Sequence, residues 1–171
     1  MVDIDTLLSW NPEGLAAVGD ELNTTRRSLL DLQDEVWDGR PTGTWVGEAA
    51  ESARTSHDQR RDALNDLVAE IAPVIMAIDT ASGVLSTAKQ DVQNARQTIM
   101  GHGWSLSTSG GRVTASPPAD AEADEGVEQA VQTAVTAIAD ALADADRADA
   151  DLAAVLQSAE RNEYDGGSST L

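Results

Sequence analysis

The feature that most constrains the fold is an apolar pattern that steps by three and four residues from Ala50 to Ile99 without a slip. Its positions are Ala50, Ala53, His57, Arg60, Leu64, Leu67, Ile71, Val74, Ile78, Ala81, Leu85, Ala88, Val92, Ala95 and Ile99. Only His57 and Arg60 interrupt the apolar series. Such heptad spacing is typical of one face of a helix that packs against other helices. We therefore predict one long helix over about residues 45–100.

A shorter helix is predicted before it, over about residues 12–37. Asn11 is a suitable N-cap, and Pro12 fits the first helical position. The apolar face of this helix consists of Leu15, Val18, Leu22, Thr25, Leu29, Leu32 and Val36. At 1.5 Å per residue it reaches roughly 40 Å, whereas the long helix reaches roughly 80 Å. A further helix must therefore cover the second half of the long one.

Local signals set the ends of the long helix. Glycine and proline in Asp38–Gly43 stop the first helix, and Thr44 is the predicted N-cap of the second. Pro73 lacks a backbone N–H, so we expect a kink near Ala69 rather than a break. The glycines of Gly101–Gly103 end the helix.

A β-hairpin and a third helix follow. Alternating apolar and polar residues around Gly110-Gly111 predict a small hairpin over about residues 103–115, which Trp104 attaches to the helical body. The third helix, over about residues 119–163, carries ten heptad positions that are all apolar. They are Val127, Val131, Ala134, Ile138, Ala141, Ala145, Ala148, Leu152, Val155 and Ala159. We expect it to run antiparallel to the second half of the long helix.

The predicted fold class is all-α, an elongated antiparallel helical bundle in one domain over residues 1–164. Residues 165–171 are expected to be a flexible tail or linker. We expect the centre of the core at the largest residues of the long seam, which are Leu64, Leu67, Ile71, Val74 and Ile78. The alanine-rich third helix is expected to be the least stable of the three, because each contact buries little area.

Composition excludes several classes of function. Eleven Lys and Arg against thirty Asp and Glu give a net charge of −19, which disfavours binding to nucleic acid or anionic membranes. There is no cysteine, hence no disulfide or thiolate metal site. The acidic N-terminal residues lack the basic and apolar regions of a cleaved signal peptide, and no apolar run is long enough to span a bilayer.

Nothing in the sequence indicates an active site, so we expect no enzymatic activity, no cofactor and no bound metal. His57 and His102 are 45 positions apart, and the chain has neither a phosphate loop nor a nucleophile elbow. His57 is predicted to hydrogen-bond an acidic residue of the first helix, and His102 to be exposed. The aspartates of the third helix are interpreted as a solvated face rather than a cation site.

The motif that stands out is Trp45-Val46-Gly47, between two amphipathic helices. Structurally, Trp45 is expected to cap the open end of the apolar seam, and Gly47 to let the neighbouring helix come close. With this placement the chain resembles the WxG-motif (Esx-like) family of type VII secretion substrates, over roughly residues 4–95. The resemblance implies a helical hairpin that pairs with a partner hairpin and is exported folded. The longer form resembles the N-terminal targeting domains of actinobacterial effectors.

One departure from that family concerns its export signal, a Tyr followed four residues later by Asp or Glu. The only Tyr is Tyr164, and Ser168 occupies the acidic position. We expect a non-catalytic interaction module that is secreted or held at the cell surface. Its expected partner is the secretion machinery or a partner hairpin, with a homo-oligomer as a further alternative. The alternatives are a cytoplasmic scaffolding protein and the N-terminal part of an effector enzyme that continues past Leu171.

Overall fold

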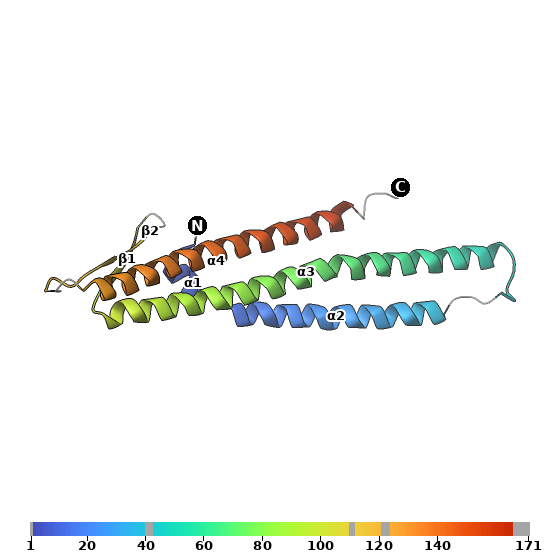
Figure 1. Ribbon diagram of the computed structural model, residues 1–171. Helices are drawn as coiled ribbons and strands as arrows, with labels where there is room; N and C mark the ends of the chain where they lie inside the picture. The colour runs from blue at the N-terminus through green and yellow to red at the C-terminus, as the bar shows by residue number, and fades with distance from the viewer. Residues whose placement is uncertain (1, 40–42, 110–111, 121–123, 166–171) are drawn as a thin grey trace. The chain divides into compact units, whose positions relative to one another are not determined.

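The computed structural model describes residues 2–39, 43–109, 112–120 and 124–165, with side chains as far as Arg161. Its elements, in chain order, are α1 (Ile4–Ser9), α2 (Pro12–Asp38), α3 (Glu48–Gly101), β1 (Ser105–Ser109), β2 (Arg112–Ser116) and α4 (Glu125–Asp165) (Figure 1). The chain is therefore mostly helical with one small hairpin, as the sequence predicts. The predicted tail, residues 165–171, lies outside the described residues except for Asp165, the last residue of α4.

Contacts within the chain fall into two compact units. The first unit comprises Met1–Ala16 and Asp79–Ala154, and the second comprises Ala17–Ile78 and Val155–Leu171. The long helix α3 contributes its first part to the second unit and its last part to the first. The single domain over residues 1–164 stays a prediction.

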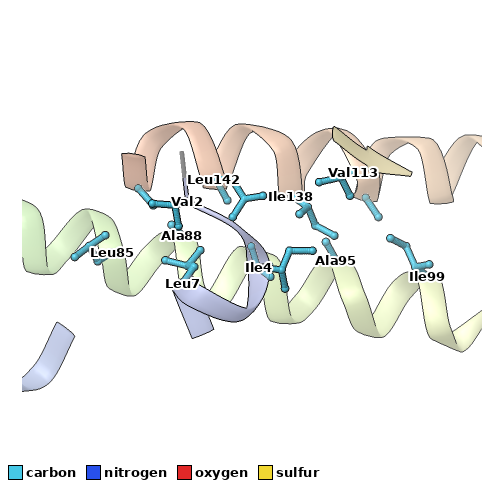
Figure 2. Packing of buried hydrophobic residues seen from close by; sticks show 14 of the residues in the cluster. Val2, Ile4, Leu7, Leu85, Ala88, Ala95, Ile99, Val113, Ile138 and Leu142 are labelled. Carbon is cyan, nitrogen blue, oxygen red and sulfur yellow. The ribbon is translucent and has the colours of Figure 1, made fainter. Parts of the chain in front are cut away.

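The core of the first unit lies where α3 packs against α4. Every heptad position of α3 from Ala81 to Ile99 is buried, and so are the α4 positions from Val131 to Ala148. Ile99 and Ile138 have no exposed surface. Figure 2 shows α4 running antiparallel to α3 along this cluster, which confirms the predicted course of the third helix. The alanines on both helices allow the backbones to come close while isoleucine, leucine and valine fill the space between them.

Helix α1 was not predicted, and it completes this core. Asp3 caps it by accepting a hydrogen bond from the Thr6 backbone N–H at 2.7 Å, and hydrogen bonding from Thr6 lowers the pKa of the Asp3 carboxyl. Ile4 and Leu7, one turn apart, are buried against α3 and α4 (Figure 2). A capping Asp followed by apolar residues at helical spacing is a sequence signal for such a helix.

The hairpin is confirmed as the sequence predicts it. Strands β1 and β2 are antiparallel, with Leu106 opposite Ala115, and Val113 is buried in the core. Trp104 is half-buried and packs against the same cluster. Gly103, at φ +75°, ends α3 in a left-handed conformation, and the N–H of Trp104 donates to the carbonyl of Ile99 at 3.1 Å.

In the second unit, α2 packs against the first part of α3. Asn11 caps α2 as predicted, because its side-chain oxygen accepts from the N–H of Gly14 at 3.0 Å. Across the pair, the Gln33 side chain donates to Asn65, and the Arg61 guanidinium lies 5.6 Å from the centre of the Trp37 ring. The contact therefore includes polar interactions.

The predicted apolar face of α2 is borne out in part, because Leu15, Leu22, Leu29 and Val36 are half-buried. Val18, Thr25 and Leu32 are exposed, whereas their neighbours Gly19, Arg26 and Gln33 are buried or half-buried. On α3, Arg60 and Leu67 are likewise exposed, and Arg61 and Val68 take the inner positions. The contact thus contains polar side chains together with half-buried leucine and valine side chains, while some apolar residues face outward.

The predicted centre of the core was therefore wrong. Leu67 is 42% exposed, Leu64, Ile71 and Val74 are half-buried, and only Ile78 is buried. The physical reason is the number of layers. Two helices bury only the narrow strip between them, whereas α3 in the first unit is covered by α4, α1 and the hairpin together.

The structure confirms the prediction for His102 and contradicts the prediction for His57. His102 is exposed, as expected. The hydrogen bond predicted for His57 was wrong, because both its ring nitrogens are buried and have no hydrogen-bond partner among the described residues. The half-buried imidazole packs in the α2–α3 unit without the acidic residue that the prediction required.

Helix α3 continues through Pro73 without a break. By length and composition it is the one helix among the described residues that could cross a membrane. Core helices pass the same test, so this is weak support for a span, and the expectation of no span stays a prediction. Only 17% of its apolar stretch is fully buried, and several of the remaining residues, such as Ile71 and Val74, are half-buried.

Truncation of core side chains tests where stability resides. We expect Ile138→Ala to lower the free energy of unfolding by about 2–5 kcal/mol, because it empties a fully buried site. Leu67→Ala should cost under about 1 kcal/mol, because this side chain is largely solvated already. Chemical denaturation of both variants measures the difference, and equal losses would contradict the structure.

Hydrogen exchange gives a second test. The burial pattern predicts a stability order opposite to the one expected from the sequence, because α4 from Val131 to Ala148 lies in the core cluster of the first unit. We expect amides of 131–148 to exchange more slowly than those of 64–74. Faster exchange of the α4 amides would instead support the expectation from the sequence that this helix is the least stable.

Candidate interaction site at the Trp45 turn

The segment between α2 and α3 is built around Gly47. This residue has φ +110°, and its carbonyl accepts from the N–H groups of Ala50 and Glu51 at 3.0 and 3.1 Å. Gly47 therefore occupies the N-cap position of α3, and the prediction of Thr44 as N-cap was wrong. The helix starts later than predicted because the chain needs this glycine conformation to enter it.

The predicted reason for a glycine at position 47, the close approach of a neighbouring helix, was also wrong. A Cβ placed on Gly47 would meet no atom within 4 Å among the described residues, so no helix approaches it closely. Glycine is needed here for its positive φ, which residues with a side chain rarely adopt.

Trp45 and Val46 are presented outward by this turn. Trp45 is 48% exposed and Val46 is 78% exposed. The carbonyl of Trp45 accepts from Arg54 Nη2 at 2.5 Å, which links the turn to the second turn of α3. The predicted capping of the seam by Trp45 is at most partial, since half of its surface remains accessible.

A second indole lies on the other side of the turn in sequence. Trp37, near the end of α2, is 52% exposed and interacts with Arg61. Arg61 in turn pairs with Asp62 at 2.9 Å, and this hydrogen bond raises the pKa of the guanidinium. From the sequence, Trp37 was predicted only to close the first helix. Its spacing from the Arg60-Arg61 pair gave no signal, because the contact depends on how α2 and α3 align.

Exposed apolar side chains gather in the second unit. Within Ala17–Ile78 they are Val18, Leu32, Trp37, Trp45, Val46, Leu67 and Met76, whereas the first unit exposes only Met100 among its described large apolar residues. Isolated exposed apolar residues are ordinary, but their number makes the second unit the candidate region for an interaction surface.

The other candidate residues give no further site. Tyr164 lies in α4, and neither its side chain nor Ser168 is among the described parts of the chain. Asp149 and Asp151 are exposed on α4. Over the described ranges, no three His, Asp or Glu side chains are grouped so that they could hold a metal ion.

Comparison with known proteins found no relative: no family model, no curated protein and no solved structure matches this chain.

The role assigned to Gly47 is testable by substitution. We expect Gly47→Ala to destabilise the α2–α3 turn by about 1–3 kcal/mol, because alanine is strained at φ +110°. Gly43→Ala is the matched control, since Gly43 has open space and no positive φ. Thermal unfolding measures both variants, and equal stabilities would contradict the role of backbone conformation.

Proposed function

We propose that this chain is an Esx-like helical interaction and targeting module of a type VII secretion substrate, without catalytic activity of its own. The observation that carries the proposal is the turn itself. Gly47 starts α3 through a conformation that favours glycine, and it leaves Trp45 and Val46 accessible at the end of a helical pair. A WxG motif that is read by another protein requires this accessibility.

The partner in this proposal is the secretion machinery or another helical hairpin. The second unit buries only Ala50, Val68 and Ile78 fully among its described apolar residues, while Leu32 and Leu67 remain exposed. A partner hairpin placed against this surface removes apolar area from water, at about 25 cal/mol per Å². The complete assembly is then an elongated antiparallel helical bundle, and the protein is exported without a cleaved signal peptide.

A secretion assay tests the proposal. In a host with an intact type VII system, we expect Trp45→Ala and Gly47→Ala each to be exported about tenfold less, or lower still, than the wild-type chain. A tenfold loss corresponds to about 1.4 kcal/mol of binding free energy in recognition. Met100→Ala is the control, because it removes an exposed apolar side chain from the first unit. Circular dichroism establishes that each variant is folded.

The outcomes separate the proposal from its rivals. Equal export of wild type and Trp45→Ala would contradict a role for the motif. Retention of the wild-type chain in the cytoplasm, with and without the secretion system, would favour a scaffolding protein instead. Reduced export of Leu32→Ser, with Met100→Ser unaffected, would extend the recognition surface from the turn to α2.

A further inference from the structure

The α3–α4 pair of the first unit has two flanks, and one of them already holds a helix. Helix α1 lies along this flank with Ile4 and Leu7 buried (Figure 2). Lys89 Nζ donates to the carbonyl of Trp10 at 2.7 Å, and the N–H of Val2 donates to Asp146 Oδ1 at 3.1 Å. The pair therefore accepts a short amphipathic segment alongside its seam.

The opposite flank holds an open groove of about 640 Å³. Successive residues of a helix are turned by about 100°, so Asp91 on α3 projects from the side opposite to Lys89. On α4, Asp140 and Asp144 project from the side opposite to Leu142 for the same reason. The groove is thus separate from the surface that α1 covers.

Small apolar residues line the groove between the two helices, among them Gly83, Val84, Ala137 and Ala141. A Cβ placed on Gly83 would meet no atom within 4 Å among the described residues, so space is open above it. Val84 and Ala137 are only half-buried, although both pack against the core. A helix with small inward residues fits such a surface, because its backbone can approach closely.

Carboxylates stand on both sides of this apolar strip. Asp79 and Asp91 line it from α3, and Asp140 and Asp144 line it from α4, while no Lys or Arg is among its described lining residues. Asp144 pairs with Arg147 at 2.8 Å, and both side chains are largely exposed. The carboxylates are too dispersed to hold a metal ion among the described residues. Their spacing instead suits several separate positively charged side chains along a partner protein.

We propose that this groove binds a basic amphipathic helix of a partner protein. Its small apolar residues lie toward Gly83 and Ala141, and its Lys or Arg side chains face the aspartates on both sides. Asp79 and Asp91 are separated by roughly 18 Å along α3, which corresponds to about three turns of the bound helix. A second copy of this chain does not fit the role, because its own net charge is −19.

The test uses the full chain and a synthetic helical peptide of four turns, with an Ala/Leu stripe flanked by Lys. A second peptide carries Glu in place of every Lys. Fluorescence anisotropy at about 0.15 M salt measures binding. We expect the Lys peptide to bind and the Glu peptide not to bind, because only the first complements the aspartates.

Two variants locate the binding to the groove. The triple variant Asp79→Asn, Asp91→Asn, Asp140→Asn should weaken binding of the Lys peptide about tenfold or more, and Gly83→Leu should do the same by filling the space without changing the charge. The matched control, Asp5→Asn, Asp149→Asn, Asp151→Asn, removes three exposed carboxylates outside the groove and should change binding less than about twofold.

Failure to bind the Lys peptide, equal weakening by both triple variants, or no effect of Gly83→Leu would each overturn the proposal. The last two results would indicate general attraction to an acidic surface. Trp45→Ala should leave peptide binding unchanged, because Trp45 belongs to the second unit. Its effect on export and the binding of the peptide are therefore separate results.

Discussion

The structure depends on the seam between the last part of α3 and α4. There, heptad positions from Ala81 to Ile99 and from Val131 to Ala148 face each other and are buried on both helices. Alanine provides close approach, and residues such as Ile99 and Ile138 provide volume. Because this seam is apolar and buried, it gives α1 and the hairpin a surface on which short elements, which are marginal alone, become stable.

Among its described residues, the second unit has no comparable buried apolar seam, and the contact between its two helices includes polar side chains. Arg26, Gln33 and Arg61 lie at the contact of α2 with α3, while Leu32 and Leu67 are exposed. A helical pair of this kind buries little apolar area by itself, so its free energy of folding depends on what else covers it. This asymmetry fits the proposal that the first unit supplies most of the stability, while the second unit carries the Trp45 turn.

The Trp45 turn shows how one backbone angle connects fold and proposed function. Gly47 begins α3 at φ +110°, and the two preceding side chains are left accessible. The bond from Arg54 to the Trp45 carbonyl then holds the turn against α3. Recognition through this turn needs a rigid presentation, because ordering a flexible loop upon binding would reduce affinity.

The sequence alone determined the helical class, the long α3, the hairpin of β1 and β2 and the inner face of α4, because uninterrupted periodicity and glycine signals act locally. It also contained a signal for α1 that was missed, the capping Asp3. Only the tertiary structure decided which half of α3 holds the core and why Gly47 is a glycine. Those properties depend on how many elements surround a residue and on the backbone angle that the assembled turn requires, and neither is encoded in heptad spacing.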